Sequence, residues 1–214
     1  MSTRYFVRAA LLVPLCLLLT GCMLARQSSP VTVLAPQVTV SPSPDWPTVV
    51  WSLQIERPRA DAMRDSARVL VQPRPSQLQV YKGAAWHEPV PDLLQSILLT
   101  AFEDSGKITA VSSAGSVRSF FRLHTEIRHF EAIDAGDGSL SVQLEVRARL
   151  ILSRDAAVVS AANFSAGIAS SDGQLPALTR AFEQALEELA GKVVGWTLAQ
   201  GQQAEAEVRK QSDR

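Results

Sequence analysis

The chain has 214 residues, of which 46% are hydrophobic and 20% charged, and its formal net charge is zero at pH 7. Nucleic-acid-binding domains carry a basic excess that neutralises phosphates, so the charge balance argues against that class. Apart from the amino-terminal segment, no long apolar run suggests a membrane-spanning helix.

The first residues have the pattern of a lipoprotein signal peptide. Arg4 and Arg8 precede an apolar run from Ala9 to Leu19, which is too short to span a bilayer permanently. Leu19-Thr20-Gly21-Cys22 then matches the lipobox, in which small residues admit the peptidase and the cysteine thiol receives the lipid. We expect residues 1–21 to be removed and Cys22 to become the lipid attachment site.

The cysteine content follows from this cleavage. Cys16 would be lost with the signal peptide and Cys22 would be acylated, which leaves no thiol for a disulfide, for catalysis or for a metal. Several acyl chains would make the anchor stable. Met23 follows the cysteine, where an aspartate would favour retention in the inner membrane, so we expect the periplasmic face of the outer membrane. The mature chain would carry a net charge of about −2, because cleavage removes two arginines and no acidic residue.

The rest of the chain is predicted to be one domain with a tether before it and a polar tail after it. Five prolines lie between Gln27 and Pro47, which favours an extended tether over residues 22–47 that could reach up to roughly 60 Å. Residues 48–200 have the size of a single-core domain. Residues 201–214 are predicted to be a polar tail.

The first half of the domain predicts three strands and a helix. Thr48 to Arg57 alternates between apolar and polar residues, and Ala67 to Gln72 and Gln77 to Tyr81 are shorter strands separated by Pro73-Arg74-Pro75. Pro91 to Phe102 has apolar residues at helical spacing behind an initial proline, which is typical of a buried amphipathic helix.

The second half predicts a hairpin-rich sheet and a second helix. A short strand at Ile108 to Val111 precedes alternating strands that begin at Phe121, at Leu140 and at Val158. Pro176 to Ala199 has an inner stripe that includes Leu178, Phe182 and Trp196. We therefore predict an α+β fold, a two-layer sandwich with a mostly antiparallel sheet and two main helices packed on one face.

No catalytic or phosphate-binding motif is present, and we expect neither a metal nor a cofactor. His124, Glu126 and Arg128 share one predicted strand face, where they are either a solvated surface or a proton-transfer cluster; His129 is expected to point the other way. Asp134 and Asp137 beside glycines indicate a turn more strongly than a calcium site.

The aromatic residues offer a candidate partner-binding surface. Trp51 and Trp196 fit core positions. Tyr81, Trp86 and His87 lie around Gly83 in a segment stiffened by prolines, and exposed aromatic residues there would suit a binding hot spot. The alternative is that Trp86 plugs the bottom of the following helix.

The segment from Ala67 to Gly106 resembles the ABC-type transport auxiliary lipoproteins, the PqiC-like group. The resemblance rests on Leu78-to-Tyr81, on Trp86-His87-Glu88-Pro89 and on the amphipathic helix that follows, and it extends over roughly residues 48–200. One element differs: Pro58 to Arg64 lacks the aromatic residue that the family usually has there.

The resemblance implies a non-enzymatic role. Family members look like lipid-anchored partners of MCE-domain proteins and their transporter complexes, which move lipids between membranes, and a homo-oligomer is possible. The alternatives are an adaptor lipoprotein for another envelope or cell-wall assembly, and a periplasmic hydrolase that would need a nucleophile beside His124.

Overall fold

The structure, a computed structural model, describes residues 30–113 and 118–212, so the signal peptide and Cys22 lie outside the described residues. The folded unit begins at Thr32. Its elements are, in chain order, β1 (Thr32–Leu34), β2 (Val49–Ile55), β3 (Arg68–Arg74), β4 (Gln77–Trp86), α2 (Val90–Asp104), β5 (Ile108–Ser112), β6 (Phe121–Asp134), β7 (Leu140–Leu152), β8 (Val158–Ala169) and α3 (Leu175–Ser212).

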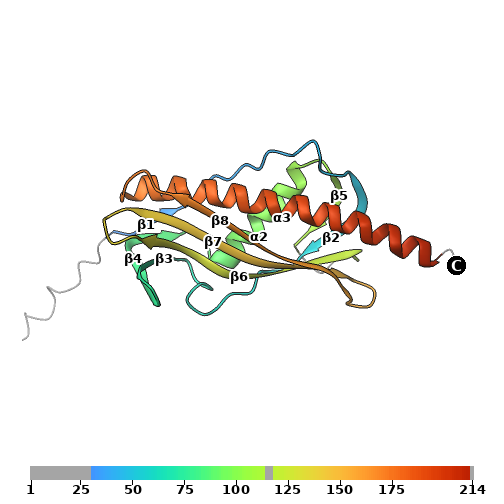
Figure 1. The fold of residues 1–214 in the computed structure, drawn as a ribbon, viewed down its shortest axis with the longest axis horizontal. Coiled ribbons are helices and arrows are strands. Elements are labelled where there is room, and N and C mark those ends of the chain that lie inside the picture. Colours follow the sequence, from blue (N-terminus) through green and yellow to red (C-terminus); the bar gives the residue numbers. More distant parts are fainter. Residues whose placement is uncertain (1–29, 114–117, 213–214) are drawn as a thin grey trace, which may run out of the picture. The chain divides into compact units, whose positions relative to one another are not determined.

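The predicted α+β fold is confirmed, with two helices on one mixed sheet of eight strands (Figure 1). Strand β6 pairs along one edge with antiparallel β7, which pairs in turn with antiparallel β8. Along its other edge β6 pairs with two parallel strands placed end to end, β2 at Phe121–Leu123 and β3 at Ala132–Ile133. The long ladders are thus antiparallel, as predicted, and the shorter pairings of β1, β2, β3 and β5 add parallel strands.

The three long strands show how alternation builds the core. Leu123 and Phe130 of β6 and Leu144 of β7 are at most 1% exposed, whereas their sequence neighbours face the opposite side of the sheet. The β6–β7 turn has Gly136 and Gly138 at φ 86° and 87°, a conformation that only glycine adopts readily. The predicted hairpin is therefore confirmed.

Helix α3 covers the apolar face of the long strands, and α2 contacts both α3 and the β2–β5 edge (Figure 1). Both helices begin near the predicted proline, with Pro91 in the first turn of α2. The polar residues after residue 200 continue α3 to Ser212, and Ala204 within this stretch is buried. A polar composition does not prevent a helix from continuing when one side still meets the core.

The predicted tether is also shorter than expected. Residues 32–34 form β1, which pairs in parallel with β4, and the proline-rich segment that follows runs along α3 with Val40 buried (Figure 1). The Gln37 N–H donates to Oε1 of Glu183 on α3 at 2.9 Å. Extended proline-rich chain cannot form a core of its own, but here it packs on a helix that does.

Two glycines on α3 leave room for indole rings, one from the proline-rich segment and one from β2. A Cβ at Gly195 would lie 2.5 Å from Nε1 of Trp46, and a Cβ at Gly201 would lie 2.3 Å from Cζ2 of Trp51. A Cβ at Gly191 would meet the Val40 side chain at 3.6 Å, an ordinary contact. Glycine is unfavourable within a helix, so Gly195 and Gly201 are best explained by the indole rings that lie against them.

Candidate functional site

The segment predicted to bind a partner is part of strand β4. Gly83 has φ 76° and lies at an irregularity of the strand, so that Tyr81 before it and Trp86 after it both face the core. Trp86 is 2% exposed and makes edge-to-face contacts with Phe130 at 5.8 Å and Phe182 at 4.9 Å. The prediction that Trp86 is presented at the surface is therefore wrong, because the glycine shifts the alternation instead of ending the strand.

His87 is the one exposed member of the predicted trio. Its backbone N–H donates to the Leu34 carbonyl at 2.9 Å, and its ring nitrogens lie 3.3 Å from the same carbonyl and 3.2 Å from Glu88. His87 thus joins β1 to the segment between β4 and α2. Tyr81 is half-buried. A partner contact at Tyr81 and His87 stays a prediction.

His124 lies in a different setting from the solvated face predicted for it. It is only 8% exposed, and its Nδ1 lies 3.0 Å from Oε2 of Glu56, whose other oxygen accepts a hydrogen bond from Arg122 at 2.8 Å. Among the described residues no serine or cysteine is hydrogen-bonded to His124. The cluster binds the chain after β2 to β6, and it lacks the nucleophile–base pair that a hydrolase needs.

His129 lies on the same side of the sheet as His124, contrary to the prediction. The ladder between β6 and β7 shifts register between Ile127 and His129, which places His129 opposite Glu145. A bulge inserts one residue and reverses the alternation that follows it, which the sequence pattern alone did not show. No group of three or more His, Cys, Asp or Glu side chains in the described part of the chain could hold a metal.

The bulge also creates a buried charged network that the sequence did not reveal. Glu131 is fully buried and accepts two hydrogen bonds from Arg64, at 2.7 and 3.0 Å. The Phe130 N–H donates to Glu131 at 2.6 Å, and Nδ1 of His129 lies 2.6 Å from its other oxygen. Asp61 accepts a further hydrogen bond from Arg64.

The electrostatics of this network favour the ionised carboxylate. Burial alone raises the pKa of Glu131, but the hydrogen bonds from Arg64, His129 and the Phe130 N–H outweigh burial and hold the pKa below its ordinary value. The same pairing raises the pKa of Arg64 against the effect of burial. The Pro58–Arg64 segment, which lacks the family's aromatic residue, is thus fastened to β6 by ion pairs.

A second set of ion pairs holds the segment after β2 to helix α2. Arg57 contacts Asp92, in the first turn of α2, and Asp65, each at 2.7 Å. Hydrogen bonds to Asp92 and Asp65 raise the pKa of Arg57 above its ordinary value. The charged residues of this region are accounted for by attachment of one segment to its neighbours.

An open hollow of about 570 Å³ lies beside the end of β2, the start of β6 and the end of β7. Three arginines from separate positions line it: Arg118, Arg122 and Arg154. Arg122 is paired with Glu56 and Arg154 with Asp155 at 3.1 Å, whereas no ion pair is found for Arg118 within the described residues. The remaining lining is mixed: Gln54, Ser119, Phe120, Leu152 and Ser153. Such a hollow could receive an acidic group of a partner, but it offers no nucleophile–base pair.

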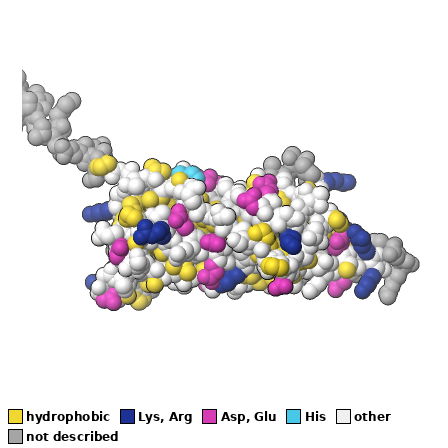
Figure 2. Space-filling view, turned by 90° about the horizontal axis from the view of Figure 1, so that it is seen from above, with side chains coloured by type: hydrophobic (Ala, Val, Ile, Leu, Met, Phe, Trp, Pro, Cys, Tyr) yellow, Lys and Arg dark blue, Asp and Glu magenta, His cyan; other side chains and the backbone are white. Residues whose placement is uncertain are grey.

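Two further observations concern the helices and the surface of the domain. Within residues 30–113 and 118–212, no helix combines the length and apolar character needed to cross a bilayer. The side that carries α3 shows acidic, basic and apolar side chains interspersed (Figure 2).

Comparison with known proteins agrees with the observed boundaries. A family model for ABC-type transport auxiliary lipoprotein components matches residues 32–194, beginning where the folded unit begins. No match was found among curated proteins.

Solved structures share the fold. Protein XCC0632 from Xanthomonas campestris is 41% identical over 82% of this chain and 99% of that chain, with a TM-score of 0.78. Two further structures are similar in fold alone. An uncharacterized protein is 15% identical over 70% of this chain and 93% of that chain, with a TM-score of 0.56. Hypothetical protein CT253 from Chlamydia trachomatis is 9% identical over 71% of this chain and 99% of that chain, with a TM-score of 0.51. The match over most of the folded unit shows that the chain belongs to the ABC-type transport auxiliary lipoprotein component family.

Proposed function

We propose that this protein is a lipid-anchored, non-enzymatic docking subunit of an MCE-type lipid transport system, located on the periplasmic face of the outer membrane. The observation that carries the proposal is the family match over residues 32–194, which names an auxiliary transport component. The lipobox ending at Cys22 supports the anchor, and Met23 supports sorting to the outer membrane.

The site geometry supports a role without catalysis. The one buried histidine has a ring nitrogen against Glu56, and that carboxylate is shared with Arg122. Glu131, the most deeply buried acid in the described residues, is satisfied by Arg64 and by a backbone N–H. Fully partnered charges of this kind fix chain segments in place, whereas a catalytic acid or base needs a free route to its substrate.

The arginine hollow is the surface we propose for the transport partner. The hollow lies beside Phe121, the first residue of β6. Strand β3 pairs with Ala132 and Ile133, near the last residue of β6. A strand rises about 3.3 Å per residue, so roughly 35 Å separates the hollow from that end. A domain anchored through its amino terminus could thereby present the hollow to a protein that approaches from the periplasm.

Site-specific photocrosslinking tests the proposal in intact cells. A photoreactive residue at Arg154 should capture an MCE-domain protein, and the same residue at Glu187, on the exposed side of α3, is the matched control. Capture of the MCE-domain protein from position 154 but not 187 is the expected result. Capture of a cell-wall assembly protein in its place would favour the other adaptor role and refute the transport assignment.

The anchor has a separate test. Cys22→Ser should abolish both lipid labelling and signal-peptide cleavage, because the thiol is the site of acylation and acylation precedes cleavage. Normal maturation and membrane retention of the Cys22→Ser protein would refute the lipoprotein assignment.

A further inference from the structure

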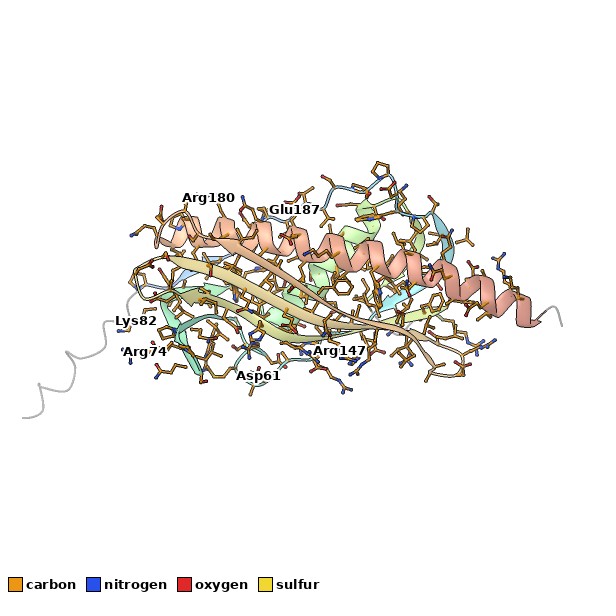
Figure 3. All side chains as sticks on the ribbon, in the orientation of Figure 1. Asp61, Arg74, Lys82, Arg147, Arg180 and Glu187 are labelled. Carbon is orange, nitrogen blue, oxygen red and sulfur yellow. The ribbon has the colours of Figure 1, made fainter. Side chains whose placement is uncertain are left out.

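The β3–β4 hairpin carries basic residues and no acidic ones. From Arg68 to Trp86 it contains three basic residues, Arg68, Arg74 and Lys82, and no acidic residue. All three side chains are exposed, and none has an ion pair within the described residues. Figure 3 shows Arg74 and Lys82 at the same end of this hairpin.

Exposed valines accompany these cations on the face of β1, β4 and β3 that is turned away from the core. Strand pairing places Val33 of β1 beside Ala85 of β4, and Ala85 beside Arg68 of β3, in one row across the sheet. Leu34 is buried, so its neighbour Val33, 63% exposed, faces outward. Val80 of β4 is 44% exposed. These two valines lie among the exposed cations of these paired strands, so one face combines apolar and basic side chains.

The position of β1 in the chain limits where this face can be. Only residues 23–31 separate Cys22 from Thr32, the first residue of β1. At a maximum of about 3.3 Å per residue this segment spans roughly 30 Å, about half the reach that the sequence suggested for a longer tether. If Cys22 carries the lipid, β1 and its neighbours therefore stay close to the headgroup layer.

We propose that the outward face of β1, β4 and β3, formed by Val33, Val80, Arg68, Arg74 and Lys82, docks on anionic lipid headgroups; this rests on the proposed anchor at Cys22. Basic side chains are attracted to anionic phospholipid surfaces, and valines can enter the headgroup boundary shallowly. The face then fixes the orientation of the domain, which a single point of attachment cannot do. The short connection to the anchor and the absence of acidic residues from Arg68 to Trp86 favour a lipid surface over a protein partner as the occupant.

Depth-dependent quenching tests this orientation with the lipidated protein in vesicles of phosphatidylethanolamine and phosphatidylglycerol. Single cysteines at Val33 or Val80 would carry a fluorophore, with Glu187→Cys on α3 as the matched control, and spin-labelled lipids would act as quenchers. The anchor holds all three labels within reach of the same membrane. We expect several-fold stronger quenching at 33 and 80 than at 187.

Removal of the three basic side chains tests whether they hold this face at the membrane. The variant Arg68→Gln, Arg74→Gln, Lys82→Gln should keep its melting temperature and its co-flotation with vesicles, while quenching at position 33 falls toward the level at 187. Each cation near an anionic surface favours contact by about fivefold. Vesicles in which phosphatidylcholine replaces phosphatidylglycerol should lower quenching at 33 in the same way.

The outcomes separate this inference from the anchor. Co-flotation with equal quenching at 33 and 187 would overturn the docking face and leave the anchor intact. Undiminished quenching in neutral vesicles, or in the triple variant, would also overturn it, because the cations would then contribute nothing. Failure of the unmutated protein to co-float would overturn both the anchor and the face.

Discussion

Replacing Gly201 by alanine would place a Cβ 2.3 Å from Cζ2 of Trp51 and 2.9 Å from two further ring atoms. The indole has little room to move, because Trp51 is 4% exposed and packs edge-to-face on Phe121 at 5.1 Å. Overpacking of this kind costs about 1–3 kcal/mol, and the better helix propensity of alanine offsets about 1 kcal/mol. With three ring atoms too close, we expect a net loss of about 1–2 kcal/mol.

Gly191 is the matched control on the same helix. An added Cβ there meets Val40 at 3.6 Å, so Gly191→Ala should gain helix propensity without a clash and stabilise the protein by about 0.5–1 kcal/mol. The two substitutions are chemically identical, and the difference between them isolates the contact with the indole.

Urea denaturation of the purified protein measures both effects as free energies of unfolding at unchanged m-value. A double-mutant cycle with Trp51→Ala measures the interaction between the added Cβ and the indole. Gly201→Ala should no longer destabilise the protein once the ring is gone, which corresponds to a coupling free energy of about 1 kcal/mol or more. If Gly201→Ala is as stable as Gly191→Ala, or if its cost persists without the indole, the packing explanation is refuted.

Three other outcomes are expected. Trp86→Ala should lower the free energy of unfolding by about 3–5 kcal/mol, since the ring is buried between Phe130 and Phe182; an unchanged melting temperature would contradict its place in the core. Leu144→Ala and Phe182→Ala should each cost about 2–5 kcal/mol, and a loss below about 0.5 kcal/mol would show that the burial is misassigned. The folded-state pKa of Glu131 lies below its ordinary value of 4.5, so its stabilising contribution is complete above that pH and is lost as the pH falls through the lower folded pKa. As the pH is lowered from 6 to 3, the free energy of unfolding should therefore fall less steeply in Glu131→Gln than in the unmutated protein. The substitution itself costs about 3 kcal/mol, because it leaves Arg64 short of a partner. Parallel curves of stability against pH would contradict the assignment.

Alternation of apolar and polar residues was enough to predict β6, β7 and β8 and the helices at Pro91 and Pro176. These patterns arise from burial of one face, which a local stretch of sequence records directly. The limits of α3 were harder to predict, because residues after Gly201 are polar around most of the helix and few apolar side chains, such as Ala204 and Val208, pack against the core.

The candidate site was less accessible to sequence reasoning. Irregularities at Gly83 and near Arg128 reverse the alternation, which buries Trp86 and turns His129 to the same side as His124. A glycine within a strand was a usable signal for the irregularity at Gly83, whereas no local pattern indicated the bulge near Arg128. The pairing of Arg64 with Glu131 joins residues 67 positions apart, and no local pattern contains such a contact.

The end-to-end placement of β2 and β3 on one edge of β6 has a consequence for how the chain acquires its fold. Both partners of β2, β5 and β6, are synthesised after it, and α3, which covers the long strands, comes last. Contacts between distant segments form slowly because the intervening chain must first be ordered. A growing chain that has not yet reached β5 and β6 therefore lacks both strands that pair with β2, and the long strands have no covering helix until α3 has been made. The β3–β4 hairpin is local enough to form earlier, but closure of the sheet and its core waits for the second half of the chain.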